Sequence, residues 1–100
     1  MASRIFLADD NPVVRQSLER FLKRHGYDVA AFETGPQLLE HARVSPPDLA
    51  LVDIRMPVMD GIEVLKRLRE MHPGVVVIMI TAFGSPESAV QALKAGAFEY

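Results

Sequence analysis

The sequence predicts an α/β fold with a doubly wound parallel sheet, in a single domain spanning residues 1–100. Short apolar runs alternate with longer segments of helical spacing, and three of these runs end in polar residues. The length of 100 residues suits one domain, and a hydrophobic content of 49% excludes intrinsic disorder. Alternating strands and helices form a parallel sheet through right-handed crossovers, which places helices on both faces.

The strands are expected at short apolar runs, and each expected helix begins or ends at a recognisable signal. Asn11 is a suitable N-cap for the first helix, and Thr34 with Gln37 resembles a capping box for the second. Asp60 is the expected N-cap of the third helix, with Glu63 in the capping-box position. The expected strands are 4–8, 27–32, 49–53 and 75–80, and the expected helices are 12–25, 35–42, 61–71 and 86–95.

Composition excludes several classes of function. The net charge is −2 and the basic residues are scattered, so no basic stripe indicates contact with nucleic acid or a membrane surface. The chain has no cysteine, which fits a reducing cytoplasm, and its longest aliphatic run, residues 75–80, is too short to span a bilayer. The three histidines have no ligand spacing and are expected at the surface.

Polar side chains follow three of the expected strands. Asp9 and Asp10 follow the first, Asp53 ends the third, and Thr81 follows the fourth. These groups should converge, because parallel strands bring their carboxyl ends to one edge. Clustered carboxylates favour a cation, and oxygen ligands favour Mg²⁺; a carboxylate can also form an aspartyl phosphate. The alternatives are that Asp9 and Asp10 only lead into a helix and that Thr81 is an ordinary strand-end residue.

The chain resembles the receiver domain of two-component response regulators over its whole length. Each matching piece is weak alone, but together and in order they are specific. The resemblance implies a flavodoxin-like receiver fold. The pieces are Asp9-Asp10 after a strand, Asp53-x-x-x-Pro57-x-x-Asp60-Gly61, Thr81-Ala82, and Ala95-Gly96-Ala97-x-x-Tyr100.

The resemblance implies a role for each residue that matches a family motif. Asp53 would be the phosphoacceptor, and Mg²⁺ would be the cofactor. Asp10 would bind Mg²⁺ directly, Asp9 would bind it directly or through water, and Arg55 would bind it through its backbone carbonyl. Thr81 would contact the phosphoryl group, Ala82 would leave room for it, and Tyr100 would be the aromatic switch residue.

The sequence departs from the family pattern at its end. The family has a lysine three residues beyond the switch aromatic, then a fifth strand and helix, whereas this chain ends at Tyr100. We therefore expect a C-terminally truncated receiver with a (βα)4 arrangement, in which the fifth unit is missing. The strand at 75–80 would then have an open edge, which favours self-association or a homodimer.

Three functions follow from these observations. The first is a phosphoacceptor switch that receives its phosphoryl group from a sensor histidine kinase and controls an output domain absent from this chain. It would be no enzyme, beyond catalysing its own phosphorylation and dephosphorylation. The run from Thr81 to Ser85 resembles receivers of transcriptional activators. The second is an interaction module that has lost switching. The third, a haloacid dehalogenase-type phosphatase, ranks last because Arg55 replaces the second acid of its Asp-x-Asp motif.

Overall fold

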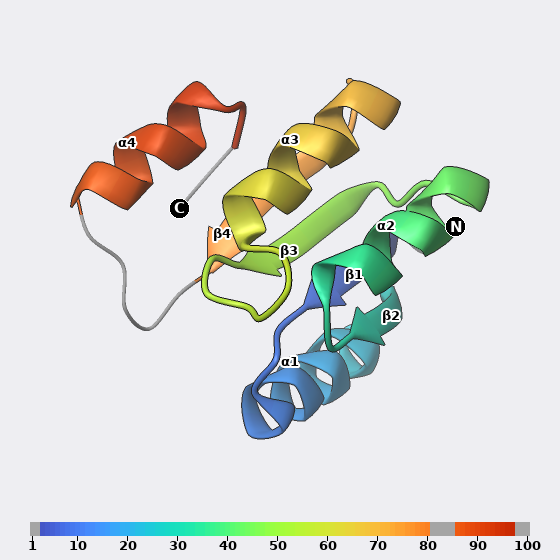
Figure 1. Ribbon diagram of the computed structural model, residues 1–100. Helices are drawn as coiled ribbons and strands as arrows, with labels where there is room; N and C mark the ends of the chain where they lie inside the picture. Colours follow the sequence, from blue (N-terminus) through green and yellow to red (C-terminus); the bar gives the residue numbers. More distant parts are fainter. Residues whose placement is uncertain (1–2, 81–85, 98–100) are drawn as a thin grey trace.

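The computed structural model describes residues 3–80 and 86–97, which form alternating strands and helices (Figure 1). The alternation predicted from the sequence is confirmed. Three elements have the expected bounds, and the other five differ by one or two residues; the second helix, for example, continues to Val44 instead of ending at Ala42. The elements are β1 (Arg4–Ala8), α1 (Pro12–Arg24), β2 (Asp28–Phe32), α2 (Gly35–Val44), β3 (Leu49–Asp53), α3 (Gly61–Met71), β4 (Val76–Ile80) and α4 (Pro86–Lys94).

The strands form one parallel sheet in the order β2-β1-β3-β4. This confirms the predicted parallel sheet, with β2 at one edge and β4 at the other within the described residues. The register pairs Ala8 of β1 with Val52 of β3, so the two strands end side by side. That pairing brings the residues after β1 next to the end of β3.

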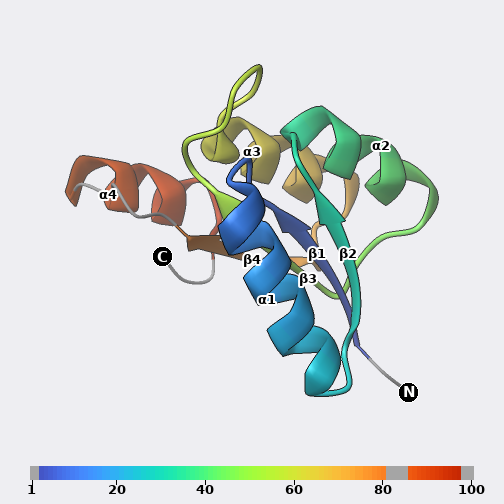
Figure 2. The same cartoon turned by 90° about the horizontal axis from the view of Figure 1, so that it is seen from below.

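The helices lie on both faces of the sheet, as predicted. Figure 2 shows α1 on one face and α2 and α3 on the other. Helix α4 lies beside α3, beyond the β4 side of the sheet (Figure 1). No helix in the described part of the chain is both long enough and apolar enough to cross a membrane.

The main core lies between the sheet and helices α2 and α3. In β3 and β4 buried residues alternate with half-buried ones, so one face of each strand is fully covered. The side chains of Phe6 and Phe32 meet edge to face, with ring centroids 5.2 Å apart. The largest fully buried side chains are Phe6, Leu7, Leu38, Leu65, Leu68, Met79, Val52, Val64 and Val77.

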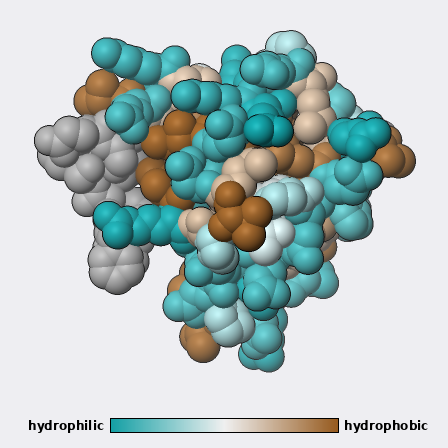
Figure 3. All heavy atoms as spheres, viewed as in Figure 1, coloured by the Kyte–Doolittle hydropathy of each residue, from teal (hydrophilic) through white to brown (hydrophobic). Residues whose placement is uncertain are grey.

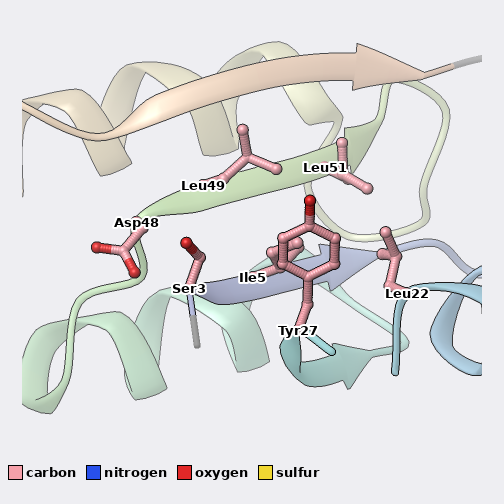
Figure 4. A pocket seen from close by; sticks show the side chains of 7 residues that line it. All are labelled: Ser3, Ile5, Leu22, Tyr27, Asp48, Leu49 and Leu51. Carbon is pink, nitrogen blue, oxygen red and sulfur yellow. The ribbon is translucent and has the colours of Figure 1, made fainter. Parts of the chain in front are cut away.

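The α1 face is packed less completely. The sequence indicates an apolar stripe on α1, yet this helix contains no fully buried residue, and Phe21 is 56% exposed. Beside α1 lies an apolar cavity of about 410 Å³, where Leu22 and Tyr27 face Leu49 and Leu51 of β3 (Figure 4). Apolar side chains on the face shown in Figure 3 stand as separate groups among hydrophilic ones.

Candidate functional site

The ends of β1 and β3 bring three carboxylates together. Asp9, Asp10 and Asp53 each offer one carboxylate oxygen, and these oxygens all lie within 4.8 Å of one another. Asp9 is buried, whereas Asp10 and Asp53 are half-buried. The convergence predicted from the strand ends is therefore confirmed for all three carboxylates.

The backbone holds Asp9 firmly in place. Its N–H donates to the carbonyl oxygen of Phe32 at 3.1 Å, which ties the end of β1 to the end of β2. Its Oδ1 accepts the N–H of Asn11 at 2.9 Å. Asn11 caps α1 as predicted, because its Oδ1 accepts the N–H groups of Val13 and Val14. The carboxylate thus sits in a turn that is fixed by the sheet on one side and by a helix start on the other.

The backbone around Asp53 is fixed in a similar way. The N–H of Ile54 donates to the carbonyl oxygen of Ile80 at 3.2 Å, and the N–H of Gly61 donates to that of Ile54 at 2.8 Å. The N–H of Arg55 donates to Asp53 Oδ1 at 3.2 Å. The start of α3 therefore lies directly against the end of β3, and the Asp53 carboxylate stays at the mouth of the sheet.

The loop between β3 and α3 contains a strained turn. The N–H of Met59 donates to the carbonyl oxygen of Pro57 at 2.8 Å, across Val58 with a φ of 73°. A positive φ at a β-branched residue is unusual and costs energy. Asp60 caps α3 as predicted through the N–H of Glu63. The Glu63 carboxylate pairs with Arg67 at 3.4 Å, so only the forward half of the expected capping box is seen in the described residues.

Electrostatics single out Asp53 within the cluster. The pKa of Asp53 is raised from 3.8 to about 6, first by burial and then by repulsion from Asp9 and Asp10. The hydrogen bond from the N–H of Arg55 partly opposes this rise in pKa. A carboxylate with a pKa of about 6 is still largely ionised at neutral pH. A nearby cation stabilises its ionised form more than it would that of an ordinary aspartate.

The chemistry of these three side chains fits a small divalent cation. All the donors are carboxylate oxygens, which Mg²⁺ prefers. Oxygens on opposite sides of Mg²⁺ stand about 4 Å apart, given ligand distances of about 2.1 Å. A cluster within 4.8 Å can therefore close around such an ion with small side-chain movements.

The roles of the other predicted site residues stay predictions. Arg55 is exposed at the start of the loop, and the role of its carbonyl oxygen stays a prediction. Thr81, Ala82 and Tyr100 lie outside the described residues. Sequence reasoning missed Arg15, whose Nη1 donates to the carbonyl oxygen of Asp9 at 2.9 Å.

Comparisons with known proteins identify close relatives. Residues 5–100 match the family described as response regulator receiver domain. The chain is 41% identical over 96 residues to the DNA-binding transcriptional regulator NtrC of Escherichia coli (strain K12), covering 96% of this chain and 20% of that protein. It is 42% identical over 96 residues to the transcriptional regulatory protein ZraR of the same strain, covering 96% of this chain and 22% of that protein. The chain thus spans about a fifth of these relatives.

Solved structures agree in fold. A CheY-like response regulator receiver domain protein from Methanospirillum hungatei JF-1 superposes with a TM-score of 0.96 at 34% identity, covering 100% of this chain and 80% of that one. A response regulator from Burkholderia pseudomallei, solved with a phosphorylated aspartic acid, a calcium ion and citrate, gives a TM-score of 0.92 at 28% identity. That match covers 98% of this chain and 58% of the other.

Proposed function

Because the chain belongs to the response regulator receiver domain family, we propose that Asp53 accepts a phosphoryl group from the phosphohistidine of a sensor histidine kinase. A receiver domain is a signalling switch of two-component systems. The observation that carries the assignment to Asp53 is its place in the carboxylate cluster, at the end of β3 and between β1 and β4. Asp9 is less suited, because its side chain is buried whereas that of Asp53 is half-buried.

The proposed transfer needs an ionised and accessible carboxylate. An Asp53 oxygen attacks phosphorus, an O–P bond forms as the P–N bond breaks, and the departing imidazole nitrogen keeps the electron pair. With its pKa at about 6, Asp53 is still largely ionised at pH 7, as a carboxylate nucleophile must be. Mg²⁺ held by Asp9, Asp10, Asp53 and the Arg55 carbonyl would offset charge on the phosphoryl oxygens.

The remaining site roles rest on the family resemblance. Thr81 donates a hydrogen bond to a phosphoryl oxygen, Ala82 leaves space beside it, and Tyr100 turns inward when Thr81 moves. Through these residues the modification changes the conformation of the chain. We place this switch in the cytoplasm, upstream of an output that regulates transcription, as the names of the NtrC and ZraR relatives suggest. The domain itself makes no contact with DNA, and its only catalysis is of its own phosphorylation and dephosphorylation.

The direct test is intact mass after incubation with acetyl phosphate and Mg²⁺. The parent chain should gain one phosphoryl group, and Asp53→Asn should gain none. Asp60→Asn is the matched control, because it removes an exposed acid from the same loop and asparagine caps a helix equally well. Labelling of Asp53→Asn at the parent level, or no labelling of the parent chain, would contradict the proposal.

A second candidate function is self-association through β4. Within the described residues β4 pairs only with β3, and Val76, Ile78 and Ile80 on one of its faces are half-buried. An apolar edge strand of this kind can pair with a second copy. Sedimentation velocity should then show dimers of both the parent chain and Asp53→Asn, and monomers of a folded Ile78→Lys variant. A parent chain that stays monomeric at high concentration would argue against this function.

A further inference from the structure

Arg15 reaches back from α1 to the loop that carries the acidic cluster. Its backbone N–H makes the helical bond to the carbonyl oxygen of Asn11 at 2.9 Å. Its half-buried side chain turns toward the sheet, where Nη1 donates to the carbonyl oxygen of Asp9 at 2.9 Å. Arg15 therefore links the first turn of α1 to the main chain of a candidate metal ligand.

This contact is a third hydrogen bond that holds Asp9. The N–H of Asp9 donates to Phe32, its Oδ1 accepts from Asn11, and its carbonyl oxygen accepts from Arg15. The bond from the Arg15 guanidinium is charge-assisted, and such bonds are stronger than those between neutral groups. Because the Asp9 carbonyl belongs to the planar peptide that leads to Asp10, holding it also restrains the position of the Asp10 Cα beside the cluster.

We propose that Arg15 is a positioning residue for magnesium binding, which sets the main chain of Asp9 and Asp10 so that their carboxylates converge with Asp53. This inference rests on the proposed function of that cluster. The guanidinium donates to a carbonyl rather than to a carboxylate, so it orders the ligands without occupying their oxygens. Groups that orient metal ligands in this way typically change metal affinity 10- to 100-fold when removed.

Charge and geometry predict opposite effects of removing Arg15. A guanidinium near the cluster repels an incoming divalent cation, so charge alone predicts tighter Mg²⁺ binding without it. Loss of the hydrogen bond frees the Asp9–Asp10 peptide and predicts weaker binding. The direction of the change in Mg²⁺ affinity therefore tells the two effects apart.

The test is calorimetric titration with Mg²⁺ alone, on variants shown to be folded by circular dichroism. Arg15→Met should raise the Kd for Mg²⁺ about tenfold, whereas Arg15→Lys, which keeps a charged donor, should stay within about threefold of the parent chain. Arg20→Met is the matched control, because it removes the same charge from an exposed position on the same helix and should leave the Kd unchanged.

Labelling by acetyl phosphate gives a second measurement. In Arg15→Met the Mg²⁺ concentration that gives half-maximal rate should rise about tenfold, while the rate at saturating Mg²⁺ stays that of the parent chain. A merely structural role would lower the saturated rate as well. Unchanged or tighter Mg²⁺ binding in Arg15→Met, or an equal loss in Arg15→Lys, would overturn the inference. If the parent chain itself fails to bind Mg²⁺ or to be labelled, the proposed function fails instead.

Discussion

Gly61 is the position where a single methyl group should disturb the site most. A Cβ there would overlap the carbonyl oxygen of Asp53 and lie 2.8 Å from both the carbonyl carbon of Asp53 and the Cα of Ile54. All of these are backbone atoms, so no side chain can rotate away. Gly61→Ala must therefore push the start of α3 away from the end of β3.

The size of the effect follows from two opposing contributions. Overpacking against backbone costs about 3 kcal/mol, and alanine recovers up to about 1 kcal/mol because it favours a helix more than glycine does. The net loss of about 2 kcal/mol corresponds to a fall in Tm of about 8–16 °C for a domain of this size. Because the strain falls on the Asp53 carbonyl, Gly61→Ala should also lower the rate of phosphorylation in the folded chain.

Thermal unfolding followed by circular dichroism measures the loss. Gly74→Ala is the matched control, because a Cβ at Gly74 would meet no atom within 4 Å. It should change stability by no more than about 1 kcal/mol, with a slight gain expected from the stiffer unfolded chain. A Gly61→Ala variant that melts within about 2 °C of the parent chain, or a Gly74→Ala variant that loses as much, would refute the reasoning.

Two further predictions concern pH and the packing of α2 on α3. The pKa of Asp53 is raised from 3.8 to about 6, so the folded chain holds this proton more tightly, and stability present below about pH 4 is lost as the pH rises through 6. In EDTA, Asp53→Asn should therefore be more stable than the parent chain by about 1 kcal/mol at pH 7, after allowing for solvent screening, and equal to it near pH 4. Urea titrations at both pH values test this, and a difference independent of pH would contradict it. His72 Nε2 contacts the carbonyl oxygen of Ala42 at 2.7 Å, so His72→Ala should cost about 1 kcal/mol by the same assay. Lys66→Ala, at an exposed position on α3, serves as the control, and an equal loss there would disprove the role of this contact.

The parts of the fold that depend on local chemistry could be predicted from the sequence. Asn11 caps α1, and Thr34 forms both halves of its capping box with Gln37. These signals work because a cap bonds to backbone only two or three residues away. The convergence of Asp9 with Asp53 also followed, because every parallel strand ends at the same edge of the sheet.

Contacts between distant segments could not be predicted in this way. His72 was expected at the surface, yet it is half-buried and bonds to Ala42, 30 residues earlier in the chain. The apolar stripe of α1 shows which residues share a face, but not how fully that face is covered; Phe21 is 56% exposed. Arg15 belongs to the polar face of α1 in the sequence, and spacing alone does not show which carbonyl oxygen a long side chain can reach.

The acidic cluster also explains why so many backbone bonds meet at this edge of the sheet. Three carboxylates within 4.8 Å repel one another, and free loops would let them move apart. Here Asp9 is held by bonds from Asn11 and Arg15, and the end of β3 is held by the start of α3. The repulsion therefore stays in the folded chain, where it adds to burial, the larger cause of the raised pKa of Asp53. A proton or a cation that relieves this repulsion binds the folded chain more tightly than the unfolded one, and so stabilises it.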